Sequence, residues 1–276
     1  MILYRDKIMD DADVRISPLD RGYYFGDGIY EVLRIYNGRF YALEKHMSRL
    51  ERSLEVVRIP LPYPMERLAR MLEELRTASG VREGSLYLQI TRGEAHRSHS
   101  FPKSCVPVLT AWCDGFPRPV DVIHGGIEVV TVADIRWLRC DVKSLNLLPN
   151  VLAKQEAKEK GADEAVLHRN GTVTECSSGN LMIVKGTTVY THPADHLILP
   201  GVTRAVTIEL ASALKIPLIE EEFTLSELME ADEVFATGTT VEVCPVRTVD
   251  GRKIGDGKPG PVTKRLQTAF EKTIPG

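Results

Sequence analysis

The chain has 276 residues, of which 43% are hydrophobic and 26% are charged, proportions typical of a folded globular protein rather than a disordered or collagen-like one. Its 35 basic and 38 acidic side chains give a net charge of −3, so the basic excess expected of a nucleic-acid-binding protein is missing. No run of about 18 apolar residues occurs, and charges interrupt the N-terminal MILYRDKIMDD, so we expect a cytoplasmic protein without a membrane anchor or signal peptide.

The first 115 residues combine strands with two helices. Apolar residues recur every three or four positions from Leu43 to Val57 and again from Met65 to Leu75, which predicts two amphipathic helices. Pro64 precedes the second helix and Gly80 follows it, as helix start and stop signals. β-Branched and aromatic runs predict strands at 29–35, 85–91 and 106–112.

Two prolines in Phe116-Pro117-Arg118-Pro119 mark the best candidate for a linker, because proline fixes φ and stiffens a connection. We therefore predict an N-terminal domain at 1–115, a linker at 116–120 and a C-terminal domain at 121–276.

The second part is richer in strands. Asn170-Gly171 between two apolar runs predicts a hairpin turn, and Thr224-Leu225-Ser226-Glu227 predicts a capping box that opens a short helix. A further hairpin is expected at Lys185-Gly186. We also expect strands at 127–132, 165–168, 173–176, 233–236 and 242–248, and helices at 150–160, 202–214 and 261–272. Short strands mixed with isolated helices favour an α+β fold over a doubly wound sheet.

Metal and disulfide chemistry is not expected. The chain has five cysteines, Cys105, Cys113, Cys140, Cys176 and Cys244. Their number is odd and no pair has CxxC spacing, which favours reduced thiols. His192 and His196 are four residues apart, but flanking prolines argue against a helical metal-binding pair.

Two segments are suited to binding an anion. Leu199-Pro200-Gly201-Val202-Thr203-Arg204 runs from a turn into a predicted helix, whose first amides are unpaired and carry the positive end of the helix dipole. Thr237-Gly238-Thr239-Thr240 is a small polar loop after an apolar strand. Each alone could be an ordinary capped helix or a solvated loop; together they suggest a phosphate site.

Lys143 and Glu175 are candidates for a nucleophile and an acid. Val142 and Leu145 give Lys143 apolar neighbours, which favour a free amine for imine chemistry. Glu175 lies in a serine- and glycine-rich segment at a strand end. Each could instead be a solvated surface charge. With the two threonine segments, however, they make up the parts that a pyridoxal 5′-phosphate enzyme needs: an imine lysine, an acid beside the pyridine nitrogen and a phosphate site.

The order and spacing of five segments resemble the class IV pyridoxal phosphate aminotransferases, which include D-amino acid aminotransferase, branched-chain aminotransferase and aminodeoxychorismate lyase. The segments are 20–31 (DRGYYFGDGIYE), 143–146 (KSLN), 175–180 (ECSSGN), 199–204 (LPGVTR) and 239–240 (TT). The resemblance implies an α+β, two-domain type IV fold. In it, a smaller N-terminal α/β domain and a larger C-terminal mixed β domain enclose the cofactor, usually in a homodimer.

The resemblance also implies roles for individual residues. Lys143 is the implied catalytic residue, as imine lysine and proton carrier, while Glu175 pairs with the pyridine nitrogen and Arg49 binds the phosphate. Ser177 lies close by, and Arg136 is either a site residue or a surface charge. The full implied cofactor set is Arg49, Lys143, Glu175, Ser178, Asn180, Leu199, Val202, Thr203, Thr239 and Thr240.

One loop bears on the substrate. Arg97 and His99 are two residues apart, so in an extended loop they face the same side. An arginine fork beside an imidazole can bind a carboxylate. The pair resembles the carboxylate trap of D-amino acid aminotransferases, to which Tyr30 would add a phenol. An exposed basic loop is the alternative. Arg34 and Glu94 are expected near the pocket for the substrate side chain.

The sequence thus predicts transamination between a D-amino acid such as D-alanine and a 2-oxo acid such as 2-oxoglutarate. The alternatives within the family are a branched-chain L-amino acid aminotransferase and aminodeoxychorismate lyase. A non-enzymatic cofactor-binding protein is the alternative outside it, although such a carrier has no need of both Lys143 and Glu175.

Overall fold

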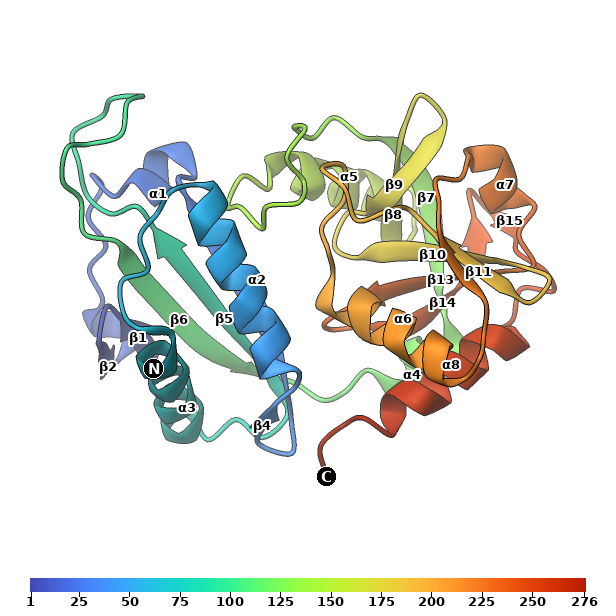
Figure 1. The fold of residues 1–276 in the computed structure, drawn as a ribbon, viewed down its shortest axis with the longest axis horizontal. Helices are drawn as coiled ribbons and strands as arrows, with labels where there is room; N and C mark the ends of the chain where they lie inside the picture. Colours follow the sequence, from blue (N-terminus) through green and yellow to red (C-terminus); the bar gives the residue numbers. More distant parts are fainter. The chain divides into compact units, whose positions relative to one another are not determined.

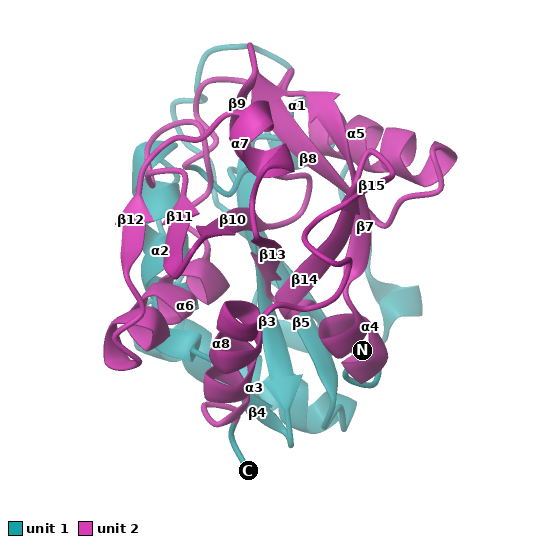
Figure 2. Ribbon diagram, turned by 90° about the vertical axis from the view of Figure 1, so that its right-hand side faces the viewer, with its two compact units in different colours: residues 1–118, 142–146, 275–276 teal, residues 119–141, 147–274 magenta.

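A computed structural model describes residues 1–276, which form two compact units (Figure 2). The first unit comprises residues 1–118, 142–146 and 275–276, and the second comprises 119–141 and 147–274. The segment 142–146 therefore belongs to the first unit, although it follows the predicted linker in the chain. The division into domains at 116–120 stays a prediction.

The first unit is an antiparallel six-stranded sheet with the strand order β2-β1-β6-β5-β3-β4. Its strands are β1 (Ile2–Tyr4), β2 (Lys7–Met9), β3 (Gly28–Tyr36), β4 (Arg39–Phe40), β5 (Gly84–Thr91) and β6 (Val108–Gly115). Its helices are α1 (Arg21–Phe25), α2 (Leu43–Val56) and α3 (Met65–Ser79), with a 3₁₀ turn at Asp11–Asp13. The two longer helices pack on the sheet (Figure 1).

The predicted amphipathic helices are confirmed as α2 and α3. Met47, Leu50 and Leu54 on α2 are buried in the same core as the apolar face of α3. The second helix ends where the sequence indicates, at Gly80, whose φ of +69° is left-handed and thus favourable for glycine.

The segment 142–146 adds to the edge of this unit by backbone pairing with β3. The Tyr30 amide donates to the Lys143 carbonyl at 2.9 Å, and the Leu145 amide donates to the Gly28 carbonyl at 3.0 Å. A Cβ on Gly28 would lie 2.7 Å from Leu145 Cδ1, so glycine is needed for this close approach. Gly28 therefore serves chain packing, and its pairing with the 142–146 segment places Lys143 beside β3.

The second unit is a mixed nine-stranded sheet with the strand order β12-β11-β10-β13-β14-β7-β8-β9, and β15 pairs with β14. Its strands are β7 (Ile127–Ala133), β8 (Glu164–Arg169), β9 (Thr172–Cys176), β10 (Asn180–Lys185), β11 (Thr188–Thr191), β12 (Leu218–Glu220), β13 (Glu233–Gly238), β14 (Glu242–Val249) and β15 (Arg252–Lys253). Its helices are α4 (Val120–Gly125), α5 (Leu148–Glu159), α6 (Val202–Ala213), α7 (Leu225–Met229) and α8 (Pro261–Glu271).

The helices of this unit cover different parts of the sheet. α6 and α8 contact each other and the strands β13 and β14, whereas α5 packs on β7 and β8. A central core between strands and α7 includes Val129, Ile183 and Phe223. The predicted α+β class is correct, since the sheets are antiparallel or mixed and the helices do not alternate strictly with parallel strands.

Local turn chemistry explains why the hairpins of this unit form where predicted. Asn170 and Gly171 between β8 and β9 have φ values of +49° and +90°, as a two-residue hairpin turn with two left-handed positions requires. The Thr224 hydroxyl and the Glu227 carboxylate form both halves of the predicted capping box.

The five cysteines are unpaired in this structure, and Cys140, Cys176 and Cys244 are buried. No helix of this chain has the length and apolar character needed to cross a bilayer.

Candidate active site

Lys143 is half-buried, and its amine lies over an aromatic ring. The Nζ atom is 4.1 Å from the centroid of Tyr30, whose ring stacks on Tyr87, which in turn stacks on Trp112. Burial raises the pKa of the Tyr87 phenol to about 12, so this phenol is uncharged near neutral pH. The structure thus brings the predicted catalytic lysine and the predicted substrate-binding tyrosine together.

Arg49 belongs to a buried ionic cluster that the sequence did not predict. Its Nε and Nη2 atoms donate to the two carboxylate oxygens of Glu31 at 2.7 and 2.8 Å. The Glu31 carboxylate also faces His46 Nδ1 at 2.8 Å. Glu31 and His46 are 1% and 2% exposed, and Arg49 is 9% exposed. Glu31 therefore fixes the orientation of the guanidinium that was predicted to bind phosphate.

The pKa of Glu31 reflects this pairing. Burial alone would raise its pKa, but the charge and hydrogen bonds of Arg49, helped by His46, lower the pKa to about 2. The pKa of His46 is lowered, mainly by its own burial.

We expect Glu31→Gln to reduce the acid sensitivity of folding. A carboxyl with a lowered native pKa contributes stability above its unfolded pKa of about 4.5, and this contribution is lost as the pH falls toward 2. A shift of this size corresponds to about 3 kcal/mol. Urea unfolding at pH 7 and at pH 3 should therefore give a free-energy difference between wild type and variant that shrinks at the lower pH. Glu51→Gln, on the exposed face of α2, is the control. An equal difference in the free energy of unfolding at both pH values would contradict a stabilising role of the Glu31 carboxylate.

Arg97 and His99 both contact Phe25, although they are exposed on the loop between β5 and β6. The Arg97 guanidinium carbon is 5.1 Å from the Phe25 centroid, and the His99 ring centroid is 5.3 Å from it. The two side chains predicted to bind the carboxylate thus share one aromatic neighbour.

Arg34 and Glu94 have partners of their own. Arg34 is 1% exposed and packs over Tyr36 and Phe116, whereas exposed Glu94 pairs with Arg5 at 2.8 Å.

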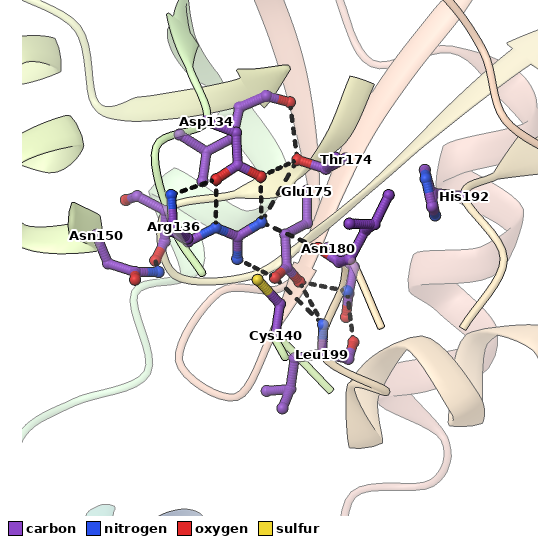
Figure 3. A network of polar contacts seen from close by, with 12 residues as sticks. Asp134, Arg136, Cys140, Asn150, Thr174, Glu175, Asn180, His192 and Leu199 are labelled. Atoms are coloured by element: carbon purple, nitrogen blue, oxygen red, sulfur yellow. Dashed lines mark hydrogen bonds and ion pairs between the residues drawn. The ribbon is translucent and has the colours of Figure 1, made fainter. Parts of the chain in front are cut away.

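In the second unit, Glu175 is the centre of a polar network (Figure 3). Arg136 Nη1 donates to one carboxylate oxygen. Asn180 Nδ2 donates to the other at 2.9 Å and also to the Leu199 carbonyl at 2.8 Å. The Leu199 amide donates to both oxygens at 3.1 and 3.2 Å. The structure therefore groups four of the residues singled out from the sequence, and Arg136 among them is buried beside Glu175 rather than exposed as a surface charge.

Burial raises the pKa of Glu175 to about 7, and Arg136 limits the rise. A further positive charge beside this carboxyl would favour its ionised form. Arg136 is itself held by Asp134, which accepts from its Nε at 2.9 Å and from its Nη2 at 2.8 Å. Arg169 also donates to Asp134, at 3.1 Å. Burial would raise the pKa of Asp134, but the hydrogen bond and charge of Arg136 lower it.

The N-terminus of α6 has no side-chain cap. Gly201 precedes the helix, and a Cβ at this position would lie 2.1 Å from Asn180 Oδ1. The amides of Val202 and Thr203, both buried residues, are in the first turn and so have no acceptor within the helix. Thr239 and Thr240 lie in the turn between β13 and β14, and the buried Thr237 hydroxyl beside them has no hydrogen-bond partner.

Ser177 and Ser178 bind a different acid. Both hydroxyls donate to Glu164, which also accepts from Lys154 Nζ at 3.0 Å. Ser178 thus has a structural partner in this unit, and its predicted contact with the cofactor stays a prediction.

Sequence reasoning missed four acids and bases that orient the predicted residues: Glu31, His46, Asp134 and Glu164. One signal was available, because His46 and Arg49 are three residues apart on a helix and therefore lie on the same side. Asp134 lies only two residues before Arg136, but its bond to Arg169 joins positions far apart in the chain. The bonds of Glu164 to Ser177 and Ser178 likewise join segments that no local pattern pairs.

The family model for class IV amino-transferases matches residues 28–249. The chain belongs to the class IV aminotransferases. Proteins of this class depend on pyridoxal phosphate and act on small amino and keto acids.

Related class IV aminotransferases match this chain over almost its full length. It is 44% identical to the D-alanine aminotransferase of Staphylococcus haemolyticus, with coverage of 99% of this chain and 97% of the relative. It is 45% identical to that of Listeria monocytogenes serotype 4b, with 99% and 96% covered. Among solved structures, the branched-chain aminotransferase of Escherichia coli superimposes with a TM-score of 0.90 at 26% identity, covering 99% of this chain and 93% of that one. The predicted type IV fold is confirmed.

The residues of this aminotransferase fit pyridoxal phosphate. The uncapped first turn of α6 and the unpartnered Thr237 hydroxyl can accept an anion. The Glu175 carboxyl, oriented by three neighbours, can pair with a protonated ring nitrogen. The Lys143 amine has no hydrogen-bonded or ion-pair partner among the contacts described. It is therefore available to react with the aldehyde carbon of pyridoxal phosphate.

Potential metal ligands occur elsewhere in the second unit. His192, Asp195 and Glu222 each offer one atom within 4.8 Å of the others. The last two are partly or fully exposed, and exposed acidic groups commonly lie this close without an ion.

Glu175→Gln is expected to slow transamination on the order of 10-fold, because a neutral amide pairs less well with a protonated ring nitrogen and 1.4 kcal/mol of barrier is one factor of ten. Asn180 and Leu199 can still hold the amide oxygen, so the fold should survive. Steady-state kinetics and the cofactor absorbance spectrum provide the test, with Glu159→Gln on the surface as control. An unchanged rate would mean that Glu175 has no part in the reaction.

Proposed function

We propose that this enzyme transfers the amino group of a D-amino acid such as D-alanine to a 2-oxo acid such as 2-oxoglutarate. The observation that carries the proposal is the 44–45% identity, over 99% of the chain, to relatives named D-alanine aminotransferase. The pairing of Arg97 and His99 on one loop supports it, since a guanidinium and an imidazole suit a substrate carboxylate.

Lys143 would hold the cofactor through Nζ, and its amine would remove the proton from the substrate Cα. Bound pyridoxal phosphate supplies an electron sink for the charge that develops at Cα. Tyr30 lies beneath the amine and limits where it can move, which keeps Nζ close to one face of the reacting centre.

Glu175 keeps the ring nitrogen protonated, and Arg136 and Asn180 hold its carboxylate in place. Arg49, the amides of Val202 and Thr203, and Thr239 or Thr240 would hold the phosphate. Leu199 would pack on the cofactor ring, and Ser178 would contribute close to it.

The alternative within the family is a branched-chain L-amino acid aminotransferase, which the fold similarity to such enzymes at 26–29% identity supports. This support is weaker than that for D-amino acids, because the sequence identity is much lower. Aminodeoxychorismate lyase chemistry would use the same lysine.

We also propose a cytoplasmic homodimer. Large apolar side chains of the second unit are exposed around the loop after β7 and on α5, as a protein–protein interface requires. They are Ile135, Trp137, Leu138, Leu148, Val151 and Leu152. Light scattering after size-exclusion chromatography should give twice the mass of 30.8 kDa.

The substrate assignment is tested by comparing D-alanine with L-leucine as amino donor and 2-oxoglutarate as acceptor. Faster turnover of D-alanine is expected. Faster turnover of L-leucine would replace the assignment with the branched-chain alternative.

A further inference from the structure

The loop that carries Arg97 and His99 is exposed on its outer side but anchored on its inner side. Residues 96–101 are exposed, whereas Arg21, at the start of the short helix α1, is 3% exposed. Figure 1 shows the loop, in blue-green, extending beside α1. The anchor of the loop is thus a part of the chain more than 70 residues earlier.

Arg21 binds the backbone of the loop between the two substrate-binding candidates. Its Nη1 atom donates to the Ser98 carbonyl at 2.7 Å, while its Nε atom donates to Asp27 at 2.6 Å. Arg92 donates to the same Asp27 carboxylate from Nε at 2.9 Å and from Nη2 at 3.0 Å. Burial would raise the pKa of Asp27, but the hydrogen bonds of Arg92 and Arg21 lower it. Asp27 therefore stays charged and fixes Arg21.

Phe25, at the other end of α1, contacts both candidate side chains. Arg97 and His99 lie 5.1 and 5.3 Å from its centroid, and the Arg21 guanidinium lies 4.8 Å from it. A guanidinium over an aromatic face is attracted by the ring quadrupole. The ring therefore limits the positions of both side chains at once.

Further contacts hold both ends of the loop. The Tyr24 hydroxyl donates to the Ala95 carbonyl at 2.7 Å. Near the other end, the centroid of the Phe101 ring lies 3.7 Å from the Arg92 guanidinium carbon. The loop is thus tied at Ala95, Ser98 and Phe101, and Arg97 and His99 lie within the tied segment, against the Phe25 ring.

We propose that Arg21 and Phe25 are positioning residues that hold Arg97 and His99 together as one preformed site for the substrate carboxylate. The proposal rests on the proposed function and deepens it. A free arginine side chain loses considerable rotamer entropy when it binds a ligand, and a side chain already held against a ring loses less. The helix α1 therefore sets the affinity for the carboxylate without touching it.

The test compares a substrate that has the carboxylate with one that lacks it. D-Alanine and D-alaninol differ only in that the second has a hydroxymethyl group in place of the carboxylate. We expect Phe25→Leu to lower kcat/KM for D-alanine about 10-fold, mostly through KM. The rate at which D-alaninol changes the cofactor absorbance should stay within about 2-fold of wild type.

Three further variants separate a positioning role of α1 from general damage to the protein. Tyr23→Leu makes the same kind of change in the same helix at a side chain that is 77% exposed, and it should leave both substrates unchanged. Phe25→Tyr keeps the ring and should restore D-alanine kinetics. Arg21→Lys keeps a positive charge near Asp27, but a lysine amine cannot donate to both Asp27 and the Ser98 carbonyl as the guanidinium does. This variant should therefore lower kcat/KM for D-alanine and leave the rate with D-alaninol unchanged, as Phe25→Leu does.

Each remaining outcome overturns a distinct claim. If Phe25→Leu lowered the rates with D-alanine and D-alaninol by the same factor, or lowered neither, the positioning role would be overturned while the proposed function stands. A wild-type enzyme that does not use D-alanine would overturn the proposed function and this inference with it.

Discussion

Lys143→Ala is expected to lower turnover of D-alanine by about 1,000-fold or more, because the positioned base that removes the Cα proton is lost and such groups contribute up to about 10⁴-fold. The amine lies over Tyr30 at 4.1 Å, and no other lysine side chain is recorded over that ring. The phosphate-binding residues are unchanged in this variant, so it should still retain cofactor.

Peptide mapping after borohydride reduction tests the same residue without reference to turnover. The label should appear on the peptide that contains Lys143 and be missing in Lys143→Ala. Lys264→Ala, on the exposed face of α8, should leave both the label and the turnover unchanged. A label on another lysine would show that Lys143 is not the imine lysine.

Arg97→Ala is expected to lower kcat/KM for every D-amino acid by a similar factor, whatever the side chain. Loss of a charged, two-pronged contact costs about 3 kcal/mol at the upper end, which is close to 100-fold. His99→Ala should act in the same direction but less strongly, because the imidazole offers a single donor. The two effects should be less than additive, since both groups bind one carboxylate.

Steady-state kinetics with D-alanine and a second D-amino acid of larger side chain provide the measurement. Arg70→Ala, exposed on α3, is the matched control and should change nothing. If Arg97→Ala left D-amino acid kinetics intact, the loop would not bind the carboxylate, and Phe25 would have no role through it.

Much of the fold could be predicted because local signals decide it. The apolar periodicity of α2 and α3, the Asn170-Gly171 turn and the capping box at Thr224 each involve residues close together in the chain. The missed strands β1, β2, β4, β12 and β15 have two or three residues each, too few for a period of two to be visible.

The candidate site was predictable only in part, for a physical reason. Lys143, Glu175 and the α6 turn stand in recognisable short segments, but groups that orient the site residues come from distant parts of the chain. Arg136 reaches Glu175 across 39 positions of sequence, and Glu31 reaches Arg49 across 18. Such pairings depend on strand order, and one sequence does not reveal them.

Loss of an α-deuterium to solvent measures directly whether Lys143 removes the α-proton of a D-amino acid. D-Alanine and L-alanine, each deuterated at Cα, are incubated with the wild-type enzyme and with Lys143→Ala, and the remaining deuterium is followed by mass spectrometry. We predict that the wild type removes deuterium from D-alanine much faster than from L-alanine and that Lys143→Ala removes it from neither. Faster loss from L-alanine would contradict the preference for D-amino acids, and undiminished loss from D-alanine in Lys143→Ala would contradict the role of Lys143 as the base.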